Sequence, residues 1–234
     1  MSSAISKETI QRLLKDVKEI LRNPLCGDGI YYSHDEVDMF KGYAMLVGPE
    51  ETPYFGGYYL FTFSFPTDYP FSPPIVTFKT GDGNTRFNPN LYKGGKVCVS
   101  ILNTWHGDKW SSCQTIKSIL LSLYCLFTNT PLENEPGVTK SHIDLEPYYR
   151  CIEYKNLDVA VCNVVKKVCW EPCFDVFYEN VREHFVKNYE NLLEKIRDKK
   201  GFKEVISIGI YGFNTPVNYE LLENKMVETY TSVI

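Results

Sequence analysis

One cysteine of this chain lies in a setting that suits chemistry. Cys98 falls within the stretch Gly81–Ser112, which is rich in glycine, asparagine and aspartate and has little hydrophobic periodicity. A compact domain rarely keeps so long an irregular stretch without a function. The residues just before the cysteine, 94–96, are two glycines and a lysine. We therefore predict an open, polar environment and an accessible thiol, and the thiolate of such a group is a nucleophile.

The other cysteines do not form a recognisable site. Cys125 and Cys162 lie in apolar runs and are predicted to be small buried side chains. Cys151, Cys162, Cys169 and Cys173 are separated by eleven, seven and four residues and contain no Cys-x-x-Cys pair. Zinc sites usually contain such a pair, so we predict no metal site.

A histidine near Cys98 raises the alternative of a cysteine protease. His106 follows Cys98 by eight residues. Cysteine–histidine dyads usually draw the histidine from a distant part of the chain, and neither His142 nor His184 has a supporting signature. We therefore interpret His106 as an exposed loop residue.

Composition limits the class of partner. The 234 residues carry a net charge of −4 and a pI near 5.7, which gives no general attraction to nucleic acid or anionic lipid. There is no apolar run of membrane-spanning length, and residues 1–20 form an amphipathic charged stretch that does not resemble an export signal. We expect a cytoplasmic monomer, with the nucleus as an alternative location, that binds neither membrane nor nucleic acid. Its thiols are expected to be reduced.

The elements that must position Cys98 begin with a helix. Apolar residues recur on one face from Ser6 to Arg22, Ser6 can cap the helix start, and Asn23-Pro24 can end it. The opposite side carries four basic side chains, which are those of Arg12, Lys15, Lys18 and Arg22.

Strand-like segments follow, separated by loops rich in glycine and proline. They are residues 30–34, 39–47, 58–65 and 75–79. No helical pattern lies between them, which favours an antiparallel meander over a parallel sheet.

Helical patterns dominate the second half. Ser111 and Gln114 fit a capping box before a helix that reaches Phe127. Further helical segments are predicted over residues 145–168 and 174–196, a short strand over 205–210, and a last helix capped by Asn218.

Several motifs in this order resemble the ubiquitin-conjugating enzyme family. They are Tyr54–Gly57, Phe65–Pro74, Asn88–Asn90, Gly95–Cys98 and Trp110–Ser111. The Z-type branch of that family is similar at four further segments, namely Arg86–Asn90, Cys98–Leu102, Asn134–Gly137 and Val159–Cys162. Asn88 replaces the histidine of most family members.

The resemblance implies an α+β fold in two parts. Residues 1–144 would form the catalytic core, with an N-terminal helix, a four-stranded antiparallel meander, an active-site loop and C-terminal helices. Residues 145–234 would form a helical extension packed on that core.

The resemblance also implies a reaction. Cys98 would accept ubiquitin, or a ubiquitin-like modifier, as a thioester from an activating enzyme and pass it to a substrate lysine, usually with a ligase. Asn90 would hold the active-site loop or stabilise the oxyanion. Glu135 would help the lysine lose its proton, although Glu133 is two residues away, and Ser100 replaces an aspartate common in the family.

Partner contacts are implied in the same way. Arg12 and Lys15 on the first helix would meet the activating enzyme, and Phe71 would meet ligases. Ser112-Cys113 replaces a proline-alanine pair that many ligases contact, which weakens the expectation of ordinary ring-finger partners. No cofactor is expected, because the activating enzyme consumes the ATP.

Two alternatives remain open. A non-catalytic ubiquitin-binding adaptor of the same fold is one, and the presence of Cys98 argues against it. A carrier dedicated to a different ubiquitin-like modifier is the other, and the sequence does not separate it from a ubiquitin carrier.

Overall fold

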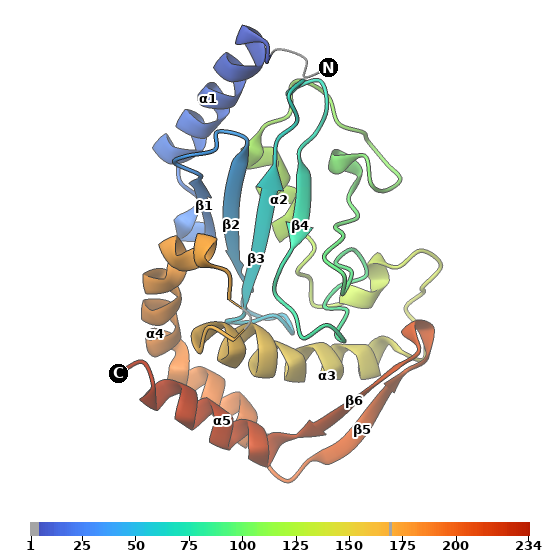
Figure 1. The fold of residues 1–234 in the computed structure, drawn as a ribbon. Coiled ribbons are helices and arrows are strands. Elements are labelled where there is room, and N and C mark those ends of the chain that lie inside the picture. Colours follow the sequence, from blue (N-terminus) through green and yellow to red (C-terminus); the bar gives the residue numbers. More distant parts are fainter. Residues whose placement is uncertain (1–4, 169) are drawn as a thin grey trace.

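The computed structural model describes residues 5–168 and 170–234. Helix α1 (Lys7–Arg22) precedes a four-stranded antiparallel sheet in the order β1-β2-β3-β4 (Figure 1). The strands are β1 (Ile30–His34), β2 (Lys41–Val47), β3 (Tyr58–Ser64) and β4 (Ile75–Phe78). The predicted meander is confirmed, since each strand pairs with the next along the chain. In the described part of the chain, no helix combines the length and apolar character needed to cross a membrane.

Helix α1 starts where its sequence predicts, but only part of its apolar side packs on the core, because Leu14 and Leu21 are exposed. The Ser6 side chain accepts a hydrogen bond from the backbone N–H of Thr9, so it satisfies one of the free donors at the helix start. Leu13, Val17 and Ile20 recur at helical spacing and are buried in the core.

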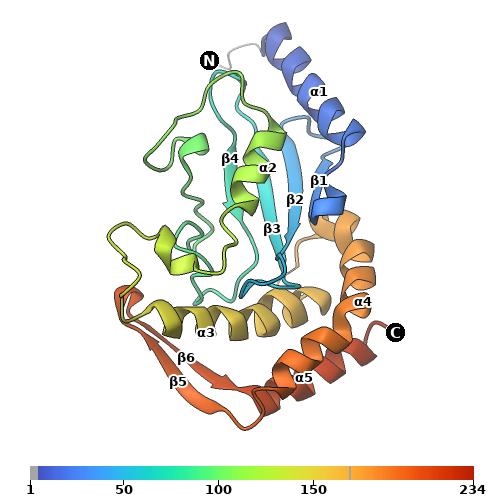
Figure 2. The ribbon, with the colours of Figure 1, turned by 180° about the vertical axis from the view of Figure 1, so that it is seen from behind.

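Helix α2 (Ile116–Tyr124) begins later than the predicted capping box. The working box uses Thr115 and Ser118, whose side chains each accept a hydrogen bond from the other residue's backbone N–H. At the predicted position only half of a box forms, because the Gln114 side chain accepts from the N–H of Ser111. The helix lies against one face of the sheet (Figure 2). Ile116, Ile119, Leu120 and Leu123 are buried, whereas Leu121 is exposed.

The segment beyond residue 144 is less helical than the predicted helical extension, because it contains a two-stranded hairpin of which only the first strand was predicted. It contains α3 (Leu145–Lys155), a π-helical continuation (Asn156–Asn163), α4 (Tyr178–Arg197), the antiparallel hairpin of β5 (Lys203–Ile208) and β6 (Phe213–Asn218), and α5 (Tyr219–Thr231). The second strand of the hairpin was missed because its sequence, with a proline and two asparagines, has low strand propensity. The hairpin lies along α3 on the side away from the sheet (Figures 1 and 2).

A buried asparagine joins this segment to the sheet. Asn156 is 2% exposed; its Nδ2 donates to the carbonyl of Phe55 at 2.8 Å, and its Oδ1 accepts from the hydroxyl of Tyr59 at 2.6 Å. A side chain at Gly57 would meet Asn156 Oδ1 at 1.9 Å, so the absence of a Cβ there allows the approach. Buried polar groups need such partners. Asn156 belongs to the extension and both of its partners belong to residues 1–144, so the two hydrogen bonds join the two parts of the chain.

Replacing this asparagine should weaken the whole fold. Asn156→Leu would leave the buried Tyr59 hydroxyl and the part-buried Phe55 carbonyl without these partners, at a cost of about 3 kcal/mol in the free energy of unfolding. Urea unfolding measures the change. The control is Asn163→Leu, a half-buried asparagine of the same π-helical segment, which should shift stability by less than about 1 kcal/mol. Equal stability of the two variants would contradict the proposed role of Asn156 in joining the extension to the sheet.

Candidate active site

Cys98 and Asn90 hold each other by two hydrogen bonds. The backbone N–H of Cys98 donates to the carbonyl of Asn90 at 2.9 Å, and Asn90 Nδ2 donates to the carbonyl of Cys98 at 2.6 Å. Asn90 is 6% exposed, and its Oδ1 is buried with no partner among the described residues. The structure thus brings together the two residues that the sequence singled out first.

Asn88 fixes the turn that carries Asn90. Its Oδ1 accepts from the backbone N–H of Asn90 at 2.9 Å, while its Nδ2 donates to the carbonyl of Leu126 at 2.9 Å and to the Tyr54 hydroxyl at 3.1 Å. The Tyr54 hydroxyl in turn donates to the Phe87 carbonyl at 2.7 Å. Burial raises the pKa of Tyr54, so its hydroxyl keeps its proton. An amide at position 88 therefore uses both its donor and its acceptor to fix the loop.

The thiol of Cys98 is less accessible than the sequence predicted. Lys96 is exposed, but Cys98 is only 1% exposed. The chain folds back directly after the cysteine, where Val99 and Thr104 exchange hydrogen bonds at 3.0 and 3.1 Å. Gly107 then lies against Ser100, with a φ of +119° that favours glycine. Gly94 and Lys96 are exposed, but this does not bring the Cys98 side chain to the surface.

Glu135 belongs to a cluster beside the same loop. Its Oε2 accepts from the Tyr211 hydroxyl at 2.6 Å and lies 3.5 Å from a terminal nitrogen of Arg86. The same Arg86 nitrogen donates to the carbonyl of Pro89, next to Asn90, at 2.5 Å. Glu133 instead accepts from Thr130 in an exposed pair. Of the two glutamates, Glu135 is the one connected to the Cys98 loop.

Sequence reasoning missed two members of this cluster, Arg86 and Tyr211. The guanidinium of Arg86 lies between two aromatic rings, 3.9 Å from the centroid of Tyr92 and 4.3 Å from that of Tyr211. Arg86 lies in the segment Arg86–Asn90, but no local pattern marks its side chain as part of a site. Tyr211 follows Glu135 by 76 residues, at the tip of the hairpin between β5 and β6, and no local pattern marks it.

The remaining cysteines are spread over the structure. Cys162 is buried as predicted, and burial raises its pKa to about 11. The prediction for Cys125 is wrong, because this residue at the end of α2 is exposed. Cys151 contacts Thr215 through its Sγ, and Cys169 lies outside the described residues. Within residues 5–168 and 170–234, no three histidine, cysteine or acidic side chains form a cluster that could bind a metal.

The positions of His106 and His184 give no support to the cysteine-protease alternative. His106 is exposed, and its ring packs near that of Trp105. His184 lies on α4 and contacts the Tyr58 hydroxyl at 3.2 Å, where burial lowers its pKa.

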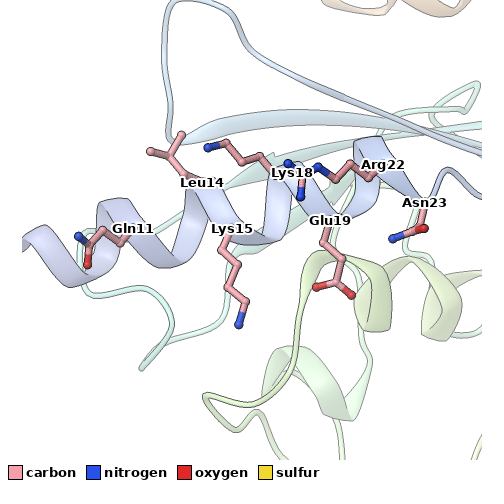
Figure 3. A pocket seen from close by; sticks show the side chains of 7 residues that line it. All are labelled: Gln11, Leu14, Lys15, Lys18, Glu19, Arg22 and Asn23. Atoms are coloured by element: carbon pink, nitrogen blue, oxygen red, sulfur yellow. The ribbon is translucent and has the colours of Figure 1, made fainter.

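The two residues proposed on α1 have different environments. Arg12 is turned inward: its Nε lies 3.0 Å from Asp16 Oδ1, and its terminal nitrogens donate to the carbonyls of Ser112 and Gln114. Lys15 is exposed and lines a shallow hollow of about 480 Å³ on the outer face of the helix (Figure 3). Only Lys15 presents its charge to solvent.

Phe71 is an exposed apolar side chain in the turn before β4. It is 64% exposed, although phenylalanine is usually buried. Its backbone N–H donates to the carbonyl of Asp68 at 2.9 Å, and the neighbouring Pro70 carbonyl accepts from Trp110 Nε1 at 2.7 Å. The turn is therefore fixed while the ring is free to meet a partner.

A helix, an antiparallel meander and a loop cysteine paired with an asparagine are the shared features of one class of enzymes. The chain belongs to the ubiquitin-conjugating enzyme family, whose sequence profile matches residues 12–146. The matched region contains Cys98, Asn90, Glu135 and Phe71.

Individual relatives support the same family and the Z-type branch. The chain is 40% identical over 186 residues to human ubiquitin-conjugating enzyme E2 Z, an alignment covering 78% of this chain and 51% of the human protein. It is 38% identical over 212 residues to the zebrafish protein of the same name, covering 84% of this chain and 64% of that protein. The chain thus spans between about half and two thirds of the length of these relatives. The resemblance inferred from the motifs is confirmed.

A solved structure supports the fold. The E2 domain of a Toxoplasma gondii ubiquitin conjugating enzyme superposes with a TM-score of 0.51 at 27% identity, covering 64% of this chain and 97% of that domain. The predicted α+β fold of this family is confirmed.

The different environments of Arg12 and Lys15 lead to a stability test. Arg12→Ala removes the cationic partner of the buried Asp16 carboxylate, which keeps only the Tyr69 hydroxyl as a side-chain donor, and it removes the donors to the turn before α2. It should cost about 3 kcal/mol of unfolding free energy. Because the Lys15 side chain is exposed, Lys15→Ala should change the unfolding free energy by less than about 0.5 kcal/mol. Chemical denaturation measures both, and equal effects would show that Arg12 is not a structural tie.

Proposed function

We propose that this chain is a thioester carrier that accepts ubiquitin, or a ubiquitin-like modifier, on Cys98 and transfers it to lysine. The observation that carries the proposal is the pair of hydrogen bonds between Cys98 and Asn90, within the region that matches the family. A thiolate suits both steps because it attacks readily at neutral pH and later departs readily.

The reaction has two transfers. In loading, the Cys98 thiolate attacks the carbonyl carbon of the thioester on the activating enzyme, and the activating enzyme's thiolate leaves. In discharge, a lysine amine attacks the new thioester, the carbon–sulfur bond breaks, the Cys98 thiolate leaves, and the nitrogen loses a proton. ATP is consumed by the activating enzyme, so this chain needs no cofactor of its own for either step.

Asn90 supports the reaction by holding the loop. Its Nδ2 is committed to the carbonyl of Cys98, which fixes the backbone at the reacting residue. In the unloaded protein, where no oxyanion is present, this contact supports the loop-holding role. Glu135, with 21% of its side chain exposed, is the carboxylate that we propose to assist proton loss from the incoming lysine.

Partner surfaces follow from exposure. We propose that the outer face of α1, with Lys15 and the neighbouring Lys18, Glu19 and Arg22, contacts the activating enzyme, and that Phe71 contributes to a ligase contact. Arg12 supports this face from within through its bond to Asp16. The adaptor alternative gains no support, because the cysteine and its asparagine are both in place.

Loading tests the proposal directly. Incubation with activating enzyme, ATP and a panel of modifiers should give an adduct that reductant removes, and the modifier that loads identifies the carrier's cargo. Cys98→Ser should give at most an adduct that resists reductant, because an oxygen ester is not cleaved by thiols. Cys125→Ser, which removes an exposed thiol elsewhere, should load normally. Absence of any adduct, or one that keeps its lability in Cys98→Ser, would refute the proposal.

Asn90 should matter more for discharge than for loading. Asn90→Ala removes the bond to the Cys98 carbonyl and should slow discharge to free lysine by about a hundredfold, with a smaller effect on loading. Single-turnover assays that follow each step separately measure the difference. Equal slowing of both steps would rule out this assignment.

A further inference from the structure

The hairpin of the C-terminal extension reaches into the Cys98 region. Its tip, residues 209–211, approaches the segment after α2, where the backbone N–H of Ile210 donates to Asp144 Oδ2 at 2.8 Å (Figure 1). From this anchored tip, the Tyr211 hydroxyl donates to Glu135 Oε2 at 2.6 Å. A residue of the extension therefore binds the carboxylate proposed to assist catalysis.

The ring of Tyr211 is held as firmly as its hydroxyl. It packs edge-on against Tyr148, with centroids 5.7 Å apart, and lies over the guanidinium of Arg86 at 4.3 Å. The Tyr148 hydroxyl donates to the backbone carbonyl of Arg86 at 2.7 Å, which fixes the cation from the other end. These contacts leave Tyr211 little freedom to point away from Glu135.

The direction of the hydrogen bond is set by chemistry. Burial, followed by the bond to Glu135, raises the pKa of Tyr211, so the phenol keeps its proton and donates it. Both contacts to the Glu135 carboxylate that involve described residues go to Oε2, one from Tyr211 and one from Arg86. The second oxygen, Oε1, is left for the incoming amine.

We propose that Tyr211 is a positioning residue for lysine discharge: it holds the Glu135 carboxylate in one orientation beside the Cys98 loop, so that the extension completes the active site. This inference rests on the proposed function. It adds that residues 203–218, outside the region matched by the family profile, contribute to the second transfer through Glu135. Tyr211 does not touch the reacting atoms and acts only through Glu135.

Tyr211→Phe tests the hydroxyl apart from the ring, because phenylalanine lacks the hydroxyl but keeps the packing against Tyr148 and Arg86. On protein already loaded with modifier, we expect the maximal rate of discharge to free lysine to fall about fivefold. The lysine concentration for half-maximal rate and the rate of loading should both stay within about twofold. Tyr154→Phe, which removes a hydroxyl bonded to Asn218 in the same extension, is the matched control and should discharge as the unaltered protein does.

A double-mutant cycle decides whether Tyr211 acts through Glu135. In a Glu135→Gln background, adding Tyr211→Phe should change discharge by less than about 1.5-fold, because the carboxylate that the hydroxyl positions is gone. A further fivefold loss in that background, or unchanged discharge in Tyr211→Phe or in Glu135→Gln alone, would overturn the inference. If no thioester forms on the unaltered protein, the proposed function itself fails, so the two failures are distinguishable.

Discussion

The guanidinium of Arg86 is the charge around which the Cys98 region is arranged. Its side chain is only 16% exposed, and a cation so far removed from water must be matched by acceptors and polarisable groups. It meets the Pro89 carbonyl, the Glu135 carboxylate and the rings of Tyr92 and Tyr211. The turn that carries Asn90, the loop that carries Glu135 and the tip of the distant hairpin are thus held by one side chain. Displacing any of them would leave this charge less well compensated.

The core and the extension share more than one kind of contact. Asn156 supplies the polar link to the sheet, and apolar contacts add to it: Leu192 of α4 lies against Gly56, and Phe174 packs edge-on against Tyr43 of β2. Removing such surfaces from water stabilises the arrangement in proportion to the apolar area buried. The extension is consequently a structural support of the core as well as a neighbour of the loop that carries Cys98.

Local patterns predicted the elements that depend on local rules. The Ser6 cap, the amphipathic face of α1 and the strand from Ile30 to His34 follow from capping and periodicity, and the structure has them where the sequence indicated. Motif spacing identified Cys98 and Asn90, whose mutual hydrogen bonds are now visible. These features need only a few neighbouring residues to define them.

Features that depend on the tertiary fold could not be read from the sequence. The burial of Cys98 depends on how the chain folds back after it, and the exposure of Cys125 depends on which side of the end of α2 meets the core. The contact between Tyr211 and Glu135 joins residues that no periodicity relates. The cap of α2 also lies later than predicted. Thr115 and Ser118 each accept a hydrogen bond from the other's backbone N–H, whereas Ser111 and Gln114 form only one such bond.

The position of Tyr211 has a consequence for the order in which the protein matures on the ribosome. Glu135 is synthesised 76 residues before its phenol partner. At about 5–20 residues per second, the interval is roughly 4 to 15 s. During that time a nascent chain already contains Cys98 and Asn90 but lacks one of the two rings that enclose Arg86. For these few seconds Cys98 is therefore present in the nascent chain while the phenol that binds Glu135 has not yet been made.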